Sequence, residues 1–438
     1  MIILRTVKNI SSLNIAASVL LFLAAILAAV VANSSLSPVY QDFLLQELHL
    51  RIGNFNLFSH GGHPLKMIEF INDCLMTVFF LAVGLEIKRE LLVGELSSVR
   101  KAALPFIAAC GGMVVPVVIY ALSVASSTPE TRGMAIPMAT DIAFSLGVLS
   151  LLGKRVPLSL KIFLTAFAVV DDIGGILVIA LFYSADVAYG YLIAAAVLYV
   201  FLYYMGKFGV TQKIFFLFFG VIIWYLFLQS GIHSTISGVI LAFVIPARPR
   251  LDAGKYIERI RDIIGEFPVS KSDNIVLTNA QIATLKQVER ASDYVISPLQ
   301  SLEDNLHGAV SFVILPLFAF ANAGVVFSGS GSIVGDVSIA VAAGLLLGKF
   351  LGIYLFTWLA VKSGVALMPA GMNWKNIAGV SLLGGIGFTV SLFIANLSFA
   401  DEYPELLNQA KFGVLVGTVL AGVLGYVVLN WVLPKREK

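Results

Sequence analysis

The chain of 438 residues is 58% hydrophobic and only 13% charged, with a mean hydropathy of +0.92. A soluble domain carries about 25% charged residues, so this composition excludes a soluble globular protein and predicts a core that is surrounded by lipid. The net charge of +3 is small, and the two cysteines, Cys74 and Cys110, both fall within apolar runs, which argues against a disulfide framework and favours buried small side chains.

Twelve apolar runs are long enough to cross, or nearly cross, a hydrocarbon core of ~30 Å, which predicts an all-α integral membrane protein with twelve transmembrane helices. The first run follows Arg5 and Lys8 and resembles a signal peptide. Its ~20 apolar residues exceed the usual 7 to 15 of a signal core, so we interpret it as a helix. The eighth run is short. The predicted spans are 13–32, 67–86, 102–125, 134–152, 157–183, 188–206, 214–229, 232–247, 298–325, 336–361, 376–399 and 408–432.

The distribution of lysine and arginine tests this map. With both termini on the cytoplasmic side, the inner segments hold 23 of the 29 basic residues, the outer segments hold 4 and the spans keep 2. The outer residues are Arg51, Lys66, Arg132 and Lys411, the last counted as outer because it lies in the first turn of the twelfth span, and those deeper within spans are Lys161 and Lys349. Cytoplasmic loops carry an excess of basic residues, so this bias predicts twelve spans with cytoplasmic N and C termini.

Two connections stand out in what we predict to be a single polytopic domain over residues 1–438. The outer segment 33–66 is long and contains LHLRIGNFNLF, which predicts a short strand pair in an ordered external element. The inner segment 248–297 is rich in charged residues and separates eight spans from four, which indicates a solvated, partly helical cytoplasmic loop. It contains no nucleic-acid-binding motif.

The fourth predicted span is interrupted by polar residues and by proline. Pro137, Thr140 and Asp141 lie at mid-membrane depth in AIPMATDIAFSLGVLSLLG. Proline removes a backbone donor from the helix, and a threonine hydroxyl can satisfy a carbonyl that the break leaves free. The pattern therefore predicts a broken helix.

The eleventh predicted span is interrupted by glycines. Three of them, Gly384, Gly385 and Gly387, lie within four residues at a comparable depth, which favours unwinding. Broken segments at corresponding places in two halves indicate an inverted-repeat transporter with a site near the midplane. We expect spans three to five and ten to twelve to be the related triplets. Packing glycines and a tolerated kink are the structural alternative.

Two adjacent aspartates, Asp171 and Asp172, lie in the fifth predicted span, where an ionised carboxylate costs roughly 2.5 to 3.5 kcal/mol. They lie ~100° apart on a helix, so both face one polar cavity only if that cavity is wide or lies at their shared edge. Lys349 in the tenth span needs a partner, and one of the two aspartates is available. Asp141 fits two roles, neutralising a facing helix N-terminus or binding an ion directly.

This group of charges suggests an exchange mechanism. Two close carboxylates do not both stay ionised cheaply, whereas a bound monovalent cation favours the charged form. Protons and the cation therefore compete for one site. Carboxylates, the Thr140 hydroxyl, backbone carbonyls and water are hard oxygen ligands that suit an alkali ion, so Asp171 and Asp172 are the expected ligands of a transported cation. A competitive site that opens alternately to each side performs antiport.

The chain resembles the NhaA-type bacterial sodium/proton antiporters, which are themselves a known example of inverted repeats with broken helices. The resemblance covers nearly the whole chain and rests on an ordered set of segments. These segments are INDCLMTVFFLAVGLEIKREL, AIPMATDIAFSLGVLSLLGKRVPLSLKIFL, VVDDIGG, SGIHSTISGVI, LPLFAFANAGV, GLLLGKFLGI and GGIGFT.

The resemblance implies that Asp171 and Asp172 bind sodium, or lithium, and protons, that Lys349 bridges to Asp171, and that Thr140 and Asp141 support the crossing of the broken helices. It also implies two protons entering for each sodium that leaves, so that one net charge moves inward per cycle. At ~100 mV that charge is worth about 2.3 kcal/mol toward sodium extrusion. The expected location is the bacterial inner membrane.

Five further positions match family residues that line the ion entrance or belong to the pH response. They are Asp73, Glu86, Glu90, His233 and Glu303. From the residues alone, Glu86 and Glu90, with Lys88 and Arg89 between them, also fit a solvated cluster at the membrane surface. His233, at an outer turn, fits a structural role better than a sensor. The 248–297 loop is longer than expected for the family.

Other classes of protein fit less well. An intramembrane aspartyl protease would use two aspartates, such as Asp141 and Asp172, but its expected Gly-x-Gly-Asp signature does not occur in the chain. A passive channel would need repeated filter loops, and none occurs. Proton-coupled uptake of an organic anion is a closer alternative and predicts a larger polar pocket. We therefore expect a transporter that is not an enzyme and needs no cofactor, with a possible homodimer contact through the 33–66 element.

Overall fold

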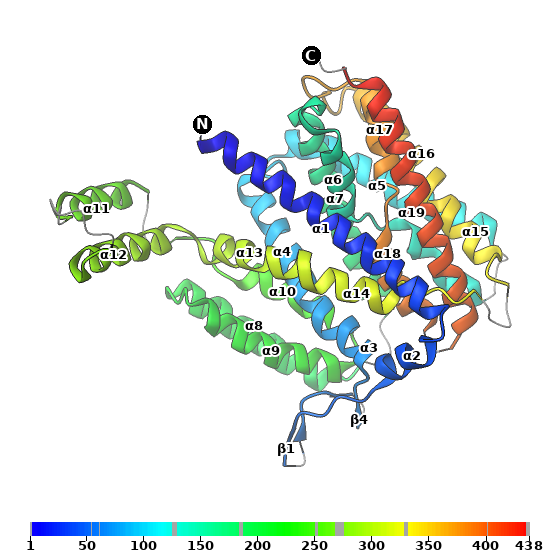
Figure 1. Ribbon diagram of the computed structural model, residues 1–438, viewed down its shortest axis with the longest axis horizontal. Coiled ribbons are helices and arrows are strands. Elements are labelled where there is room, and N and C mark those ends of the chain that lie inside the picture. The colour runs from blue at the N-terminus through cyan, green and yellow to red at the C-terminus, as the bar shows by residue number, and fades with distance from the viewer. Residues whose placement is uncertain are drawn as a thin grey trace.

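The computed structural model describes residues 2–53, 55–60, 62–124, 129–183, 187–249, 253–267, 276–327, 332–400 and 402–434. It is a bundle of long helices (Figure 1). Within the described ranges, nine helices are long and apolar enough to cross a membrane. They are Ile15–Ala32 within α1 (Ile2–Ala32), Met67–Val93 (α3 Met67–Phe70, η1 Ile71–Leu75, α4 Met76–Val93), α5 (Val99–Ser123), α7 (Leu158–Phe182), α8 (Tyr189–Lys207), α9 (Lys213–Ser230), Pro298–Asn322 (α13 Pro298–Ala309, η4 Val310–Ile314, α14 Leu315–Asn322), Asp336–Lys362 (α15 Asp336–Ala343, η5 Gly344–Gly348, α16 Lys349–Lys362) and α19 (Pro404–Val432).

Two further spans are broken. The 3-10 helix η2 (Pro129–Met138) is followed by α6 (Ile142–Leu151), and α17 (Trp374–Leu383) is followed by α18 (Phe388–Phe399). Each pair is bent by 44° at its break. The breaks lie at the two positions that the proline and the glycines predict. When each bent pair is counted as one span, the described residues contain up to eleven candidate spans.

The predicted eighth span, 232–247, forms only the ten-residue helix α10 (Thr235–Val244). At 1.5 Å per residue this helix is about 15 Å long, about half of the hydrocarbon core, so it does not qualify as a span by itself. The prediction of twelve full-length helices therefore exceeds what the described residues contain. Lys88 donates hydrogen bonds to the carbonyls of Ala242, Phe243 and Ile245, which fixes the C-terminal end of α10 against α4.

The segment 33–66 contains the short helix α2 (Ser37–Leu45) and two antiparallel strand pairs. Strand β1 (Arg51–Ile52) pairs with β2 (Phe55–Asn56), and β3 (Ser59–His60) pairs with β4 (His63–Pro64). The inner segment 248–297 contains α11 (Ala253–Gly265) and α12 (Asn279–Val295), which pack on each other. Figure 1 shows these two helices beside the bundle rather than within it, as expected for a charged, partly helical segment. A one-turn 3-10 helix, η3 (Gly153–Arg155), connects α6 to α7.

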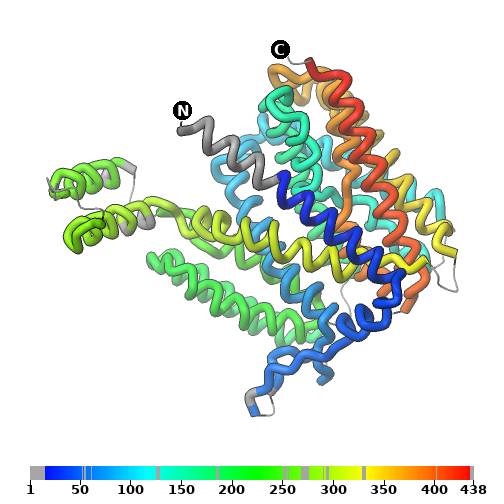
Figure 2. Tube along the Cα trace, viewed as in Figure 1, coloured from blue at the N-terminus to red at the C-terminus, as the bar shows by residue number. Residues whose placement is uncertain are grey.

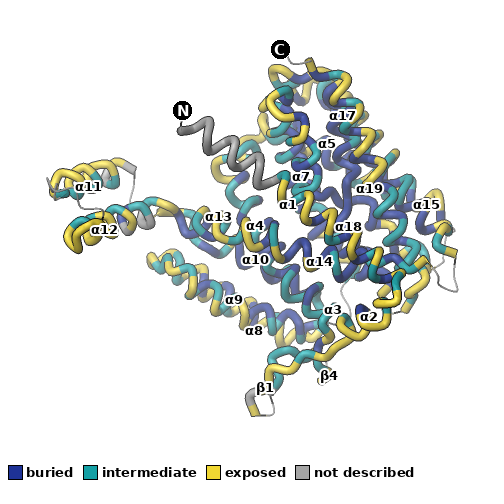
Figure 3. The backbone as a smooth tube through the Cα atoms, in the orientation of Figure 1, coloured by how far each residue is buried: buried dark blue, intermediate teal, exposed yellow. Residues whose placement is uncertain are grey.

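The core of the bundle is built from helices of both halves of the chain. Helix α5 packs on α7 and on α16, and α19 packs on α15 and α17. In Figure 2 the cyan and green helices of residues 99–182 accordingly lie against the orange and red helices near the C-terminus. Figure 3 shows most buried backbone in α5, α7 and α18, whereas α8 and α9 at one edge carry many exposed residues. The most buried charged residues, Asp141, Asp171 and Lys349, lie in this shared core.

Candidate functional site

The two broken spans touch at their breaks. The Asp141 backbone N–H donates to the Ile386 carbonyl at 2.6 Å, and the Thr140 hydroxyl donates to the Gly384 carbonyl at 2.8 Å. Both acceptors lie in the unwound stretch between α17 and α18, where the helix no longer supplies donors. Non-helical backbone at membrane depth is tolerated only when such groups are satisfied by neighbouring protein. Each broken span therefore supplies the hydrogen bonds that the other lacks.

Two serines that the sequence analysis did not single out add hydrogen bonds in both directions between the broken spans. Ser145 Oγ, at the start of α6, donates to the Leu383 carbonyl at the end of α17, at 3.0 Å. Ser391 Oγ, at the start of α18, donates to the Ile136 carbonyl near the end of η2, at 2.8 Å. Both serines are fully buried and each lies four residues after a break. That shared spacing is the signal by which the sequence could have identified them.

Asp141 neutralises two helix N-termini at once. Its Oδ1 accepts from the Phe144 backbone N–H at 3.0 Å and caps its own helix, α6. Its Oδ2 accepts from the Thr389 hydroxyl at 2.7 Å and from the Thr389 backbone N–H at 3.2 Å, at the start of α18. The N-terminal ends of helices carry partial positive charge, and here two of them converge. Both carboxylate oxygens are in use, which favours the charge-neutralising role over direct ion binding.

The glycines of the second break are required by close backbone approach. A Cβ at Gly385 would collide with the Leu345 carbonyl of η5, and a Cβ at Gly387 would lie 2.9 Å from the Ala139 carbonyl of the first break. Real Cβ atoms essentially never approach backbone so closely, so a side chain at Gly387 would push the two broken spans apart and one at Gly385 would push the second broken span away from η5. Gly384 is similarly enclosed, because a Cβ there would collide with Ile353 of α16.

Asp171 and Lys349 form a buried ion pair. Lys349 Nζ lies 2.7 Å from Asp171 Oδ2, and both side chains are 0% exposed. The ammonium also lies 5.6 Å from the centre of the Phe167 ring, which favours a cation. Lys349 follows directly after η5, a single π-helical turn in an otherwise α-helical span. Such turns are frequent at functional sites, and this one precedes the residue that crosses to α7.

The remaining oxygen of Asp171 lacks a donor. Among the described residues, Asp171 Oδ1 is buried and has no hydrogen-bond partner. The Thr140 hydroxyl and the Thr140 backbone N–H both lie close to the Asp171 carboxylate, but the hydroxyl donates to the Gly384 carbonyl and neither group forms a hydrogen bond of good geometry with Oδ1. The Asp171 and Thr140 oxygens are therefore two neighbouring potential ligands. A buried acceptor without a donor is costly, and a small cation would satisfy both oxygens.

Asp172 differs from its neighbour in access and in partners. It is 9% exposed, against 1% for Asp171, and it forms no hydrogen bond or ion pair with any described residue. It is repelled by the charges of Asp171, Glu86 and Asp141. Among the described residues no group of three or more His, Cys, Asp or Glu side chains is placed to hold a metal. A cation at this pair would therefore also need neutral oxygens, such as that of Thr140.

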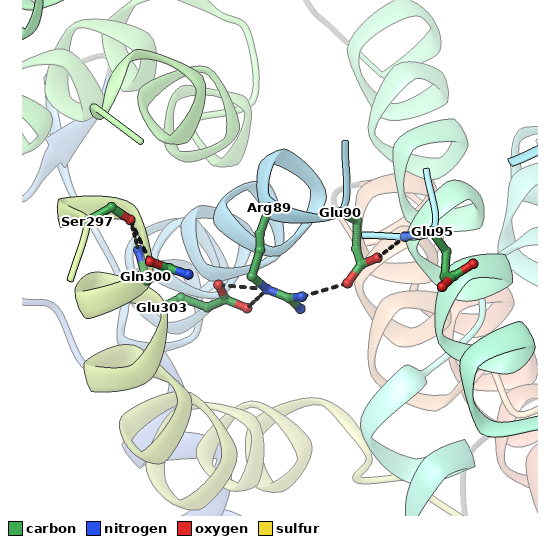
Figure 4. A network of polar contacts seen from close by, with 6 residues as sticks. All are labelled: Arg89, Glu90, Glu95, Ser297, Gln300 and Glu303. Atoms are coloured by element: carbon green, nitrogen blue, oxygen red, sulfur yellow. Dashed lines mark hydrogen bonds and ion pairs between the residues drawn. The ribbon is translucent and has the colours of Figure 1, made fainter. Parts of the chain in front are cut away.

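The acidic residues near the end of α4 form an ordered network. Arg89 Nε donates to Glu303 of α13 at 2.9 Å, and Arg89 Nη1 donates to Glu90 at 2.7 Å (Figure 4). Glu90 is buried and also accepts from the Glu95 backbone N–H at 3.0 Å. Arg89 and Glu303 line a cavity of about 440 Å³. Glu86 is half-buried on the same helix, and its carboxylate interacts electrostatically with Arg89 and with Asp172. Charge changes in this network can therefore reach the carboxylate pair through Glu86, by electrostatics and not by direct contact.

Asp73 and His233 lie apart from this network. Ser234 Oγ donates to Asp73 Oδ1 at 3.3 Å, and Trp224 Nε1 donates to the Asp73 carbonyl at 3.3 Å. His233 and Ser234 directly precede α10, whereas Lys88 holds the opposite end of that helix. A helix of ten residues separates the two groups by about 15 Å. The five residues that resemble family positions therefore form one group around Arg89 and a second group around Asp73.

Three asparagines form a polar contact that the sequence analysis missed. Asn322 of α14 donates to Asn72 Oδ1 of η1 at 2.8 Å, and Asn396 of α18 donates to Asn322 Oδ1 at 2.9 Å. Hydrogen bonds between polar side chains hold membrane helices together. These bonds tie three spans from distant parts of the chain. Single asparagines in apolar runs offer no pairing signal, so the sequence does not reveal which of them meet.

A second cavity lies beside the C-terminal end of α7, the helix that carries Asp171 and Asp172. Its volume is about 710 Å³ and it lies between η2, α5, α7 and α18. Val178 in its wall is seven residues after Asp171 and therefore lies on the same face of α7. Tyr183, at the end of α7, donates to the Arg132 carbonyl at 2.7 Å. Burial raises the pKa of Tyr183 to about 12, so its hydroxyl keeps this proton at ordinary pH.

Two broken helices that cross beside buried carboxylates and a buried lysine, inside a bundle of apolar spans, define a multi-pass membrane transporter of the discontinuous-helix class. Comparison with known sequences gives the family. The sequence model described as "Na+/H+ antiporter 1" matches residues 8–429. The chain therefore belongs to the Na+/H+ antiporter 1 family, whose members are transporters rather than enzymes.

Relatives named Na(+)/H(+) antiporter NhaA match over the full length. A protein of Bacteroides fragilis is 75% identical over 437 residues, covering 100% of both chains. One of Bacteroides thetaiotaomicron is 74% identical over 438 residues with the same coverage. One of Parabacteroides distasonis is 51% identical over 444 residues, covering 100% of this chain and 98% of the relative. The resemblance inferred from the sequence segments is thereby confirmed.

Proposed function

We propose that this protein exchanges cytoplasmic sodium, or lithium, for external protons at Asp171 and Asp172. The observation that carries the proposal is the adjacency of a buried Asp171 oxygen without a hydrogen bond, beside Thr140, and an Asp172 that has no partner among the described residues. Protons can neutralise these carboxylates, and a cation can be coordinated by them, but the two forms exclude each other. Competition of this kind couples the two ions at one site.

Alternating access follows from the position of the pair between two cavities. The cavity beside Arg89 and Glu303 serves as the cytoplasmic entrance, and the cavity beside Val178 and Tyr183 serves as the external route. The crossing of the broken spans lies between them. Movement of the half-helices around this crossing opens the carboxylates first to one side and then to the other. The inverted repeat proposed for α5 to α7 and α15 to α19 supplies two related halves for this movement.

The proposed topology places both termini in the cytoplasm of the bacterial inner membrane. Helix α10 with its flanking residues would form the eighth crossing and bring the total to twelve, which returns the C-terminus to the side of the N-terminus. The excess of basic residues in the inner segments supports this arrangement. The two strand pairs of the 33–66 element then lie outside, where they offer a contact for a homodimer. The charged 248–297 segment, with α11 and α12, is cytoplasmic.

We expect two protons to enter per sodium extruded. In everted vesicles with an acid interior, adding sodium or lithium should dissipate the pH gradient, as followed with a pH-sensitive dye. One net charge then crosses per cycle, and at ~100 mV that charge is worth about 2.3 kcal/mol. Exchange should therefore be faster when the membrane potential favours charge movement. A rate that is the same with the potential present and collapsed would contradict the stoichiometry, and no response to either cation would contradict antiport.

The network around Arg89 is proposed to set the pH response. Replacing Glu86 with glutamine removes a negative charge that repels Asp172, so it favours the charged, cation-binding form of Asp172. We expect the curve of exchange rate against pH to move about one unit toward acid, equivalent to about 1.4 kcal/mol. Glu258→Gln on exposed α11 is the control and should leave the curve in place. A lower protein yield with an unmoved curve would mean that Glu86 has only a structural role.

A further inference from the structure

A cavity of about 350 Å³ lies at one boundary of the helix bundle, away from the carboxylates. Helix α1 ends there at Ala32, α14 ends there at Asn322 and α19 begins there at Pro404, with α2 alongside. Much of the wall is apolar, supplied for example by Leu44 and Leu407. Because three spans end or begin at this level, the cavity lies where hydrocarbon meets the polar surface of the membrane. Its volume falls within the usual range for small-ligand sites.

Lys411 of α19 lines this cavity and has no counter-ion within the part of the chain that the structure describes. Its side chain is half-buried and makes no hydrogen bond or ion pair with any described residue. Two polar neighbours, Asn408 and Tyr40, have partners elsewhere. Asn408 Nδ2 donates to the Val326 carbonyl at 2.9 Å, its Oδ1 accepts from the Val326 backbone N–H at 3.0 Å, and Tyr40 donates to the Phe320 carbonyl at 2.6 Å. A partly buried ammonium without a partner is costly, so an anion entering the cavity would gain a charge-assisted contact.

One carboxylate also lines the cavity, and it lies nearer to solvent. Glu405, in the first turn of α19, is exposed and is not within ion-pair distance of Lys411. The two are six positions apart on the helix, which is about 9 Å along the axis. The cavity thus presents a positive charge inside and a negative charge at its mouth. A ligand that carries both a phosphate and an amine complements this order of charges.

The surroundings of the cavity favour a lipid over a dissolved ligand. Helix α2 contributes Tyr40 and Leu44 to the wall, whereas Val39 and Phe43 on its outer side are 65% and 44% exposed. Exposed apolar residues on a short helix at this level need an apolar environment, as in helices that lie in the membrane interface. Acyl chains beside α2 would supply that environment while the headgroup fills the cavity.

We propose that this cavity binds the headgroup of a zwitterionic, amine-bearing phospholipid of the outer leaflet, with its phosphate on Lys411 and its ammonium on Glu405. The bound lipid joins the ends of α1, α14 and α19 at the membrane surface. This site is separate from the exchange of sodium and protons, so its test does not depend on transport. An anionic lipid, free phosphate and a second copy of the chain are the alternatives that the test must distinguish.

The test uses the full-length protein, purified in a non-ionic detergent and delipidated, with short-chain phosphatidylethanolamine as the probe. Bound lipid is counted by native mass spectrometry, and the midpoint of thermal unfolding is followed during the titration. We expect one bound lipid and a raised midpoint. Lys411→Gln should weaken binding at least about tenfold, equivalent to about 1.4 kcal/mol, and Lys411→Arg should keep it. Lys207→Gln, at an exposed lysine of α8, is the matched control and should change nothing.

The selectivity for the amine is tested separately with short-chain phosphatidylglycerol and with inorganic phosphate. Glu405→Gln should weaken phosphatidylethanolamine binding and strengthen phosphatidylglycerol binding, because the carboxylate that attracts one headgroup repels the other. Equal binding of both lipids by the unchanged protein would overturn the assignment to an amine-bearing headgroup. Inorganic phosphate that raises the midpoint as much as the lipid does would overturn the lipid. Unchanged lipid binding in Lys411→Gln, or a cavity closed by dimerisation, would overturn the site.

Discussion

Replacing Asp172 with asparagine is expected to abolish sodium-dependent dissipation of a pH gradient in everted vesicles. Asparagine keeps the shape of the side chain but neither carries a charge for the cation nor exchanges a proton between pH 5 and 9. The variant should nevertheless fold, because Asp172 forms no hydrogen bond or ion pair with the described residues and the Asp171–Lys349 pair is left intact. We expect its stability to equal or exceed that of the unchanged protein, since repulsion from Asp171 is removed.

The same variant should lose stabilisation by the transported ion. A ligand that binds only the folded protein at 100 times its dissociation constant adds about 2.7 kcal/mol to the free energy of unfolding. Sodium should therefore raise the thermal midpoint of the unchanged protein but not that of Asp172→Asn. Asp262→Asn, at an exposed residue of α11, is the matched control and should keep both exchange and the sodium effect. Exchange that survives in both Asp172→Asn and Asp171→Asn would show that the ion binds elsewhere.

The spans and their breaks could be predicted because each has a local cause. Apolar length predicts a crossing, the glycines in 376–399 lie at the break itself, and Pro137 in 134–152 lies in the 3-10 turn that directly precedes the other break. Helix α10 was overestimated for the same reason. Its apolar run extends over 232–247, but the helix does not begin until Thr235, and Ile245 is already extended. The length of an apolar run shows how hydrophobic a segment is, but it does not show where the helix begins and ends.

The partners of the charged residues could be predicted only where few choices existed. Lys349 is the only basic residue near the centre of a span in the second half of the chain, and the fifth span offers two aspartates, so few other partners were available to it. The hydrogen bonds of Ser145 and Ser391 to the opposite span depend on how two breaks approach in space. The separation of His233 from Arg89 is also a matter of packing, because family resemblance groups residues by role and not by position. These contacts join residues far apart in the chain. A local pattern can single out a residue, as the spacing of Ser145 and Ser391 from the breaks does, but it does not give the residue's partner.

Lys88 illustrates the same limit for a single side chain. In the sequence it belongs to a run of charges, Glu86 to Glu90, and the run as a whole fits a solvated face. In the structure Lys88 bonds carbonyls at the end of α10, whereas Arg89 turns to Glu303 on α13. A basic side chain at the C-terminal end of a helix is a favourable arrangement, but the helix in question lies more than 150 residues away. Lys88 and Arg89 are adjacent in the sequence but bind two different helices, α10 and α13.

Replacing Lys349 with methionine is expected to lower the free energy of unfolding by about 3 to 5 kcal/mol, because it leaves the Asp171 carboxylate buried without its partner. Lys362→Met, on the same helix, is the matched control. Lys362 is exposed and only contacts the Trp358 ring, at 5.6 Å, so its loss should cost about 1 kcal/mol or less. Denaturant titration of the purified protein measures both values.

A double variant separates the ion pair from packing. Adding Asp171→Asn to Lys349→Met removes the uncompensated charge, and replacing both members of a buried pair is often nearly neutral. We therefore expect the double variant to regain most of the stability lost by Lys349→Met alone, a coupling of several kcal/mol in a double-mutant cycle. Losses that simply add would mean that Lys349 and Asp171 contribute independently. Asp171 and Lys349 would then have no favourable interaction energy, so a mechanism in which sodium or a proton replaces Lys349 as the partner of Asp171 would be contradicted.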